Sequence, residues 1–214
     1  MAFIKPTGSI LRSHPINSKN NNAKKFNSAI SGLLKTLNEF AISLNDKAIK
    51  NMPLSELDKV CFILINTYEN ENENFGIGPL NDAIHICLHY RRLHYRVFYL
   101  YNPRSSQFIS FLEYFLKNTI NNLTVFYSGY DSSNKNIHDI KFPNGHLPSK
   151  DIKKSIMQNC NGKAKITFIT NSFNGGSVFD ITSINNSNNQ QTKNDIISFW
   201  VEKDQSNNNS KKSH

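Results

Sequence analysis

The residues best placed to bind or transform a ligand follow short apolar segments that resemble the strands of a parallel sheet. In open α/β sheets, ligands bind beyond the carboxyl ends of the strands. Glycines at two of these ends favour tight backbone turns beside a pocket, and the nearby hydroxyl groups offer possible nucleophiles. The pocket candidates are Asn66, Ser128, Gly129, Tyr130, Asp131, Asn171, Ser172, Phe173, Asn174, Gly175, Gly176 and Asp204.

The segments that position these residues alternate between strand and helix patterns. Continuous apolar runs predict buried strands at residues 61–65, 95–100, 123–127, 166–170 and 196–201. Apolar stripes predict helices at residues 30–44, 83–90, 108–116 and 149–157, with Asn81-Asp82 before the second and Ser149 as N-cap of the last. This alternation predicts an α/β fold with right-handed crossovers, a parallel sheet and helices on both of its faces.

The length of 214 residues predicts a single domain flanked by polar ends. Residues 1–25 are rich in Asn and Lys, so we expect a loose arm there, and we expect a polar tail at residues 207–214. The folded domain is therefore predicted to span residues 26–206. No stretch approaches the roughly 18 apolar residues of a membrane span, and no signal peptide precedes the domain, so we expect a cytoplasmic protein without membrane contact.

The formal net charge of +9 raises the question of an anionic partner. Basic pairs such as Lys24-Lys25, Arg91-Arg92 and Lys153-Lys154 are far apart in the sequence, and no basic run contains interleaved aromatic residues. This scattering argues against nucleic acid as the partner, although a basic α/β module that binds nucleic acid or acidic protein stays open as an alternative.

Three cysteines and a pair of histidines are the candidates for reactive or metal-binding groups. Cys61 at the start of a predicted strand and Cys87 on a predicted helix fit the core, and Cys160 precedes a strand and should lie at the opposite edge of the sheet. The cysteine spacing predicts neither a disulfide nor a metal site. His85 and His89 lie four residues apart on a helix, but a third ligand is lacking, so no metal or cofactor is predicted.

Five motifs, in order, resemble those of the caspase, metacaspase and paracaspase clan over about 145 residues from Cys61 to Ser206. The family has an apolar strand ending in Asn-Tyr, a Leu-x-Gly-x-x-Asn-Asp-Ala turn, Tyr-Ser-Gly-His-Gly, Asp-Cys-Cys-His-Ser-Gly-Ser and Ser-Ala-x-x-Asp-x-Gln. The similar segments here are residues 65–68, 77–83, 127–131, 171–177 and 198–205. The resemblance implies a caspase-like three-layer α/β/α sandwich with a mostly parallel central sheet.

The departures from the family pattern concern its chemistry. The catalytic histidine and cysteine of the family correspond to Tyr130 and Phe173 here. Phe173 has no nucleophilic atom, and the reference pKa of a tyrosine, near 10, makes Tyr130 a poor base at neutral pH. The aspartate that selects basic side chains in metacaspases corresponds to Asn171, which implies that the specificity pocket has lost its charge.

Both losses together predict an inactive peptidase homologue that acts by binding a protein or peptide, for example an active metacaspase-like homologue. An unorthodox hydrolase that uses Ser172 or Tyr130 is the alternative, although alternation along the strand points Ser172 away from the side of Phe173. Caspases dimerise through a strand that follows the fifth. Because the chain after residue 206 is polar, a monomer is expected.

Overall fold

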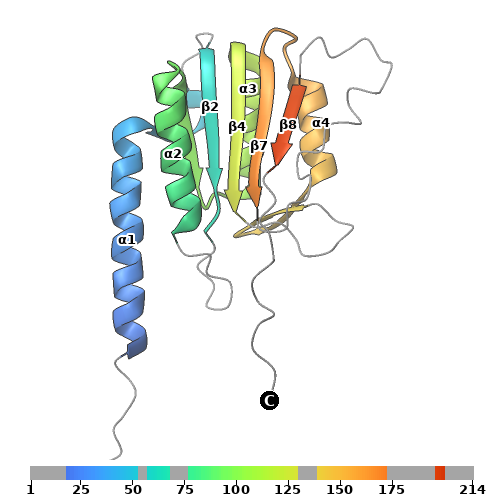
Figure 1. Cartoon of the computed structure of the whole chain (residues 1–214). Coiled ribbons are helices and arrows are strands. Elements are labelled where there is room, and N and C mark those ends of the chain that lie inside the picture. The colour runs from blue at the N-terminus through green and yellow to red at the C-terminus, as the bar shows by residue number, and fades with distance from the viewer. Residues whose placement is uncertain (1–17, 53–56, 68–76, 130–138, 173–195, 201–214) are drawn as a thin grey trace, which may run out of the picture.

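The structure, a computed structural model, describes residues 18–52, 57–67, 77–129, 139–172 and 196–200 (Figure 1). For residues 18–24, 172, 196 and 198–200 only the backbone is described. Among the described helices, none combines the length and the apolar character that crossing a bilayer requires.

The centre of the fold is a six-stranded sheet in which every neighbouring pair of strands is parallel. The prediction of a parallel α/β sheet is therefore confirmed, and the five predicted strands are all present. The two-residue strand β1 at one edge was not predicted. In spatial order the strands are β1 (Ile42–Ser43), β3 (Arg96–Tyr101), β2 (Leu57–Ile65), β4 (Thr119–Gly129), β7 (Lys165–Ser172) and β8 (Ile196–Trp200).

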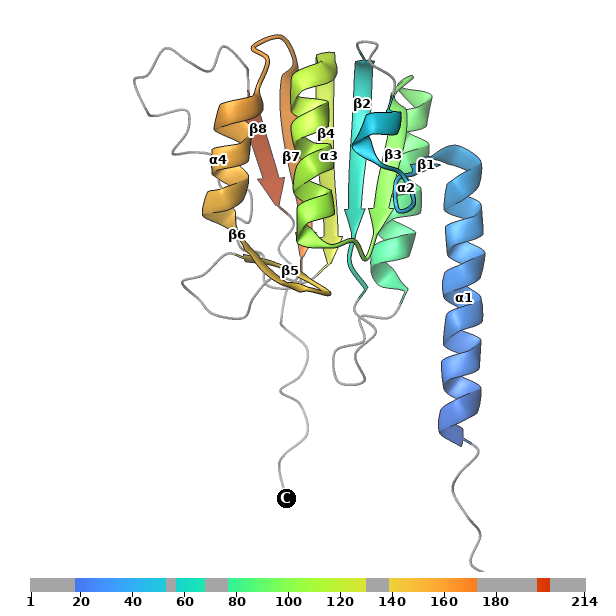
Figure 2. The same cartoon turned by 180° about the vertical axis from the view of Figure 1, so that it is seen from behind.

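Two helices cover each face of the sheet and complete three layers (Figures 1 and 2). On one face α2 lies against the strands with α1 packed beside it, and α3 and α4 cover the opposite face. A two-stranded antiparallel hairpin, β5 (Asp139–Phe142) and β6 (Gly145–Pro148), stands between β4 and α4. The helices are α1 (Ser18–Phe40), α2 (Gly78–Arg92), α3 (Ser105–Asn118) and α4 (Ser149–Asn159), with a short 3-10 turn at Ile49–Asn51.

The two faces of the sheet form separate hydrophobic cores, because successive side chains of a strand point to opposite sides. On β2, Phe62 and Leu64 belong to the core beneath α3 and α4, whereas Cys61 and Ile63 belong to the core beneath α1 and α2. Phe62 stacks on Phe108 of α3 with ring centroids 5.8 Å apart. A strand buried on both faces explains why the sequence of β2 is continuously apolar.

Several boundaries differ from the sequence predictions. The helix predicted at residues 30–44 ends at Phe40, and Ile42–Ser43 form β1 instead. Helix α1 begins at Ser18, so residues 18–25, which we assigned to a loose arm, are helical and continue the helix towards its N-terminus. Helix α2 begins at Gly78 with Pro79 in its first turn, so Asp82 is a helical residue rather than a cap. Helix α4 is preceded by Pro148, and no side-chain cap bond is made there.

Candidate functional site

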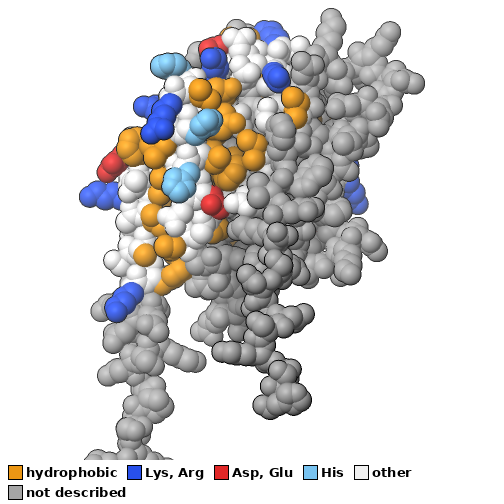
Figure 3. Space-filling view, in the orientation of Figure 1, with side chains coloured by type: hydrophobic (Ala, Val, Ile, Leu, Met, Phe, Trp, Pro, Cys, Tyr) orange, Lys and Arg blue, Asp and Glu red, His pale blue; other side chains and the backbone are white. Residues whose placement is uncertain are grey.

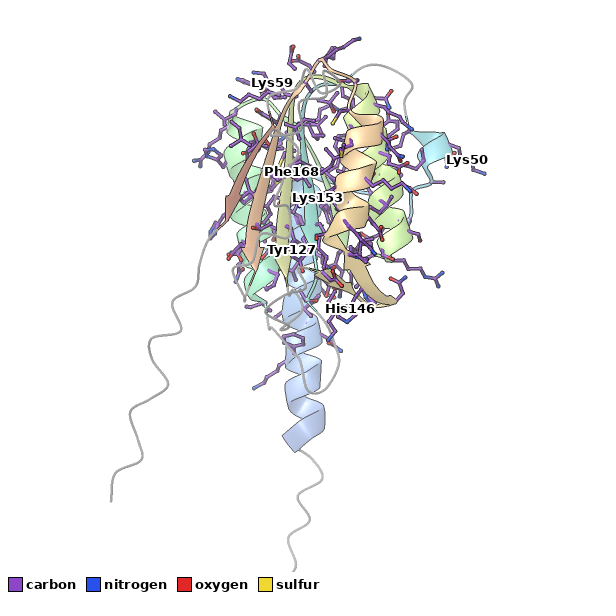
Figure 4. The ribbon with its side chains drawn as sticks, turned by 90° about the vertical axis from the view of Figure 1, so that its right-hand side faces the viewer. Lys50, Lys59, Tyr127, His146, Lys153 and Phe168 are labelled. Atoms are coloured by element: carbon purple, nitrogen blue, oxygen red, sulfur yellow. The ribbon has the colours of Figure 1, made fainter. Side chains whose placement is uncertain are left out.

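The carboxyl ends of the central strands bring polar residues together where the sequence predicted a site. Ile65 of β2, Ser128 of β4 and Asn171 of β7 stand in register across neighbouring strands. Asn66 follows β2 directly, and its backbone N–H donates to the carbonyl oxygen of Ser128 at 3.0 Å. Figure 4 shows Tyr127 near this edge and Lys59 at the opposite one. Parallel strands therefore place these polar groups at the same edge.

The carboxylate of Asp82 on α2 accepts two hydrogen bonds at this edge. Its Oδ2 atom accepts a hydrogen bond from Oγ of Ser128 at 3.0 Å and a second from Nδ2 of Asn171 at 2.7 Å. Ser128 is buried, whereas Asp82 and Asn171 are half-buried. These two hydrogen bonds link helix α2 to β4 and β7. They place a carboxylate beside Asn171, the position where the sequence predicted loss of charge.

The amide of Asn171 leaves one acceptor without a donor. Its Nδ2 must face the carboxylate of Asp82, because the opposite amide orientation would bring two acceptors together. Its Oδ1 is buried and accepts no hydrogen bond from the part of the chain that the structure describes. An acceptor buried without a donor is costly, so this oxygen is suited to an N–H group of a ligand.

The opposite face of the same edge is closed by the β5–β6 hairpin. Nδ2 of Asn66 donates to the backbone carbonyl of Lys141 on β5 at 2.9 Å. A Cβ atom at Gly129 would lie 2.9 Å from Cβ of Asn66 and 2.8 Å from the hydroxyl oxygen of Tyr127, so only glycine fits there. Asn66 thus links the hairpin to the end of β2, and Gly129 leaves room for the Asn66 and Tyr127 side chains on this face, away from the Asp82 group.

A third polar group links the ends of β2 and β3. The backbone N–H of Thr67 donates to Oδ1 of Asn102 at 2.8 Å, and Nδ2 of Asn102 donates back to Oγ1 of Thr67 at 3.1 Å. The hydroxyls of Thr67 and Tyr101 are 2.9 Å apart. Asn102 adopts a positive φ of 45°, a conformation that asparagine tolerates better than most residues. These bonds fix the chain as it leaves β2 and β3.

The chain's three cysteines all lie in the described part and all lie away from this edge. Cys61 is in the middle of β2, four residues after the strand start rather than at it, and Cys87 is buried on α2. Cys160 is the C-cap of α4, before the start of β7. Burial raises the pKa of Cys61 well above its usual value, and burial raises the pKa of Cys87 and of Cys160 to about 11. All three are therefore neutral thiols at physiological pH.

Four of the predicted pocket residues lie at the carboxyl edge of the sheet, and the side chains of the others are not described. Asn66, Ser128, Gly129 and Asn171 share the carboxyl edge but divide between its two faces. For Ser172 only the backbone, at the end of β7, is described. The positions that lie outside the described residues are Tyr130, Asp131, Phe173, Asn174, Gly175, Gly176 and Asp204.

Sequence reasoning missed the central residue of the group. Asp82 was interpreted as part of a helix start, although the family motif that contains it gave a signal of its importance. Asn171 itself carries no charge, but the carboxylate of Asp82 lies 2.7 Å from its Nδ2, so an acidic side chain is present beside that position. His85 and His89 are exposed on α2, and within the described ranges no group of three His, Cys, Asp or Glu residues could hold a metal ion.

Comparisons with known proteins find similarity among solved structures. No protein-family model matches the chain, and no curated protein matches it. Among solved structures, the chain is similar to the Drosophila initiator caspase Dronc, with 17% sequence identity and a TM-score of 0.46. The match covers 52% of this chain and 47% of the caspase chain.

Proposed function

We propose that this protein is a caspase-like domain that has no cysteine-peptidase chemistry and that acts by binding a peptide segment with a basic side chain. The segment belongs to a protein partner, for which an active homologue of the metacaspase type is a candidate. The proposal combines the motif resemblance with the position of the cysteines and the acidic group at the carboxyl edge.

The observation that carries the loss of chemistry is the position of the thiols. A cysteine peptidase requires a thiolate beside a base at the site where the substrate lies. The sequence contains three cysteines, and each lies in the middle of a strand, on a helix or at the amino edge of the sheet. Their raised pKa values keep them protonated, so they lack both the place and the ionisation that the reaction needs.

The observation that carries the binding is the group formed by Asp82 and Asn171. A carboxylate and a nearby carbonyl oxygen are acceptors, so they suit a ligand with several N–H donors and a positive charge. The ammonium of lysine and the guanidinium of arginine have these properties. The hydrogen bond from Ser128 holds the carboxylate in place, so a bound cation would meet a preorganised acceptor.

The chemistry is tested with fluorogenic peptides that end in Arg, Lys or Asp before the reporter, with and without calcium. We expect no turnover by the wild-type chain. A Tyr130→His, Phe173→Cys double variant should react covalently with a peptidyl chloromethyl ketone, because it restores the family's dyad on the same scaffold. Cleavage by the wild-type chain that iodoacetamide abolishes would contradict the proposal, and a Ser172→Ala variant would test whether any remaining turnover is of the serine type.

The binding is tested by fluorescence anisotropy with a short labelled peptide that contains one arginine in a Gly-Ser context. The matched ligand replaces arginine by citrulline, which has the same shape and no charge. Because a hydrogen-bonded charge contributes about 1.5–3 kcal/mol, we expect affinity for the arginine peptide to be roughly tenfold to a hundredfold higher. Equal affinity for the two peptides would remove the basis of the proposed specificity.

A further inference from the structure

The fold gathers at one place many of the basic residues that are scattered in the sequence. The amino edge of the sheet, where the strands begin and the helices end, lies opposite the candidate site. Figure 3 shows Lys and Arg side chains around this upper end of the described surface. The residues that we call the basic edge are Lys59, Arg91, Arg92, Arg96, Lys117 and Lys165.

The strand register sets the spacing of part of this surface. Lys59 of β2, Asn122 of β4 and Lys165 of β7 pair directly across the sheet, and Arg96 begins β3 on the other side of β2. Because neighbouring strands lie about 4.8 Å apart, the backbones at Lys59 and Lys165 are about 10 Å apart. The basic edge is therefore a row across the sheet, with further cations supplied by the helix ends behind and in front of it.

Helix dipoles account for only part of this charge. The C-termini of α2 and α3 lie at this edge, and each favours a nearby cation. Arg91 and Arg92 in the last turn of α2 and Lys117 in the last turn of α3 serve that purpose. Each helix end carries only about half a negative charge, and Lys59 and Lys165 are on strands, so a positive excess remains.

Within the described residues of this edge, acidic side chains do not balance the excess. Among the described residues that begin the strands and end the helices, Asp58 is acidic, and its Oδ1 already accepts a hydrogen bond from Nδ2 of Asn121. Arg91, Arg92, Arg96 and Lys165 are exposed. Bringing them together costs electrostatic self-repulsion, which an anionic partner would relieve.

We infer that the basic edge binds the phosphate backbone of nucleic acid without sequence specificity. Between Lys59 and Lys165 the edge presents Asn122, whose amide is of the kind that donates hydrogen bonds to phosphate and sugar oxygens in such complexes. A protein interface has an apolar centre, and a membrane surface helix has apolar anchors. Here the exposed hydrophobic side chains among the described residues are Leu93 at the end of α2 and Met157 in the last turn of α4, and these two helices lie on opposite faces of the sheet. The scattering in the sequence, which argued against nucleic acid, is not preserved in space.

The test measures the affinity of the full chain for a labelled 20-nucleotide single strand between 50 and 200 mM salt. The edge variant carries Arg91→Gln, Arg92→Gln, Lys117→Gln and Lys165→Gln. The control variant carries Lys47→Gln, Lys50→Gln, Lys150→Gln and Lys154→Gln, which lowers the net charge equally at exposed positions away from the edge. At 0.1 M salt each phosphate contact multiplies the binding constant by about 5, so we expect more than a hundredfold loss in the edge variant.

The salt dependence gives a second readout that a merely structural effect would not change. The wild-type chain and the control should show similar slopes of affinity against salt, and the edge variant should have a slope lower by about 2 to 3. Equal losses in the edge and control variants would overturn the inference, because they would show only an effect of net charge. It would also be overturned if polyglutamate competed as well as the single strand, or if vesicles with phosphatidylserine bound the edge while nucleic acid did not.

Discussion

Two substitutions of Asp82 separate its structural role from its proposed role in binding. In Asp82→Ala the hydroxyl of Ser128, which is buried, and the amide of Asn171, which is half-buried, lose the oxygen that accepts from both. An abandoned buried donor costs about 1–3 kcal/mol, and the half-buried amide adds about 1 kcal/mol. We therefore expect Asp82→Ala to lower the free energy of unfolding by about 2–4 kcal/mol. Asp82→Asn retains an acceptor oxygen of the same shape and should cost only about 1 kcal/mol.

The assay combines urea and thermal unfolding, both followed by circular dichroism, with anisotropy of the arginine peptide. For a chain of this size the melting temperature should fall by roughly 5–15 °C in Asp82→Ala and by a few degrees in Asp82→Asn. The peptide should lose at least about tenfold in affinity in both variants, because both lack the charge. Asp46→Asn, an exposed acid after β1, is the control and should leave both quantities unchanged. An Asp82→Asn variant that binds the arginine peptide as well as the wild-type chain would refute the reasoning.

Two further substitutions and one titration test the fold around the site. Gly129→Ala should lower the free energy of unfolding by about 1–3 kcal/mol, because its Cβ would lie 2.9 Å from Cβ of Asn66. Gly32→Ala, with nothing within 4 Å, should be neutral or stabilising, and equal effects in the two urea titrations would contradict the packing described. Burial raises the pKa of Cys87 from 9.0 to about 11, so the folded state favours the neutral thiol. This contribution, roughly 1–2 kcal/mol, is present below pH 9 and is lost as the pH rises towards 11, so a Cys87→Ala variant should lose less stability between pH 8 and 10.5.

The fold was predictable from local patterns because its strands are buried on both faces and its helices on one. The apolar run around Phe62 and the stripe around Phe111 each indicate one element, and their alternation predicts the parallel sheet. The two-residue strand β1 has no such pattern, since a single pair of residues cannot show a period. The strands of the β5–β6 hairpin were not predicted, because each has only four residues, Pro143 lies in the turn between them and Pro148 ends β6.

The N-termini of helices α2 and α4, which were wrongly predicted, depend on single hydrogen bonds and on proline. Asn81 and Asp82 have the composition of a helix cap, but Pro79 already fits the first turn, so the helix begins earlier and Asp82 becomes available to Ser128. Ser149 likewise has the composition of a cap, but the extended Pro148 occupies the N-cap position. A sequence pattern cannot decide between neighbouring cap positions when two of them have suitable residues.

The charge of the candidate site cannot be inferred from a single motif position. At Asn171 the family pattern has an aspartate, and the replacement predicts a neutral pocket. In the fold, Asn171 donates to a carboxylate that is 89 residues away in the sequence, so the acidic group enters from helix α2 rather than from the end of β7. An aspartate at position 171 would stand within hydrogen-bond distance of Asp82, and two adjacent carboxylates repel one another unless a cation lies between them. Asparagine removes that repulsion and donates a hydrogen bond to the remaining carboxylate. The replacement therefore leaves one hydrogen-bonded carboxylate that is stable without a ligand, as the proposed reversible binding of a basic side chain requires.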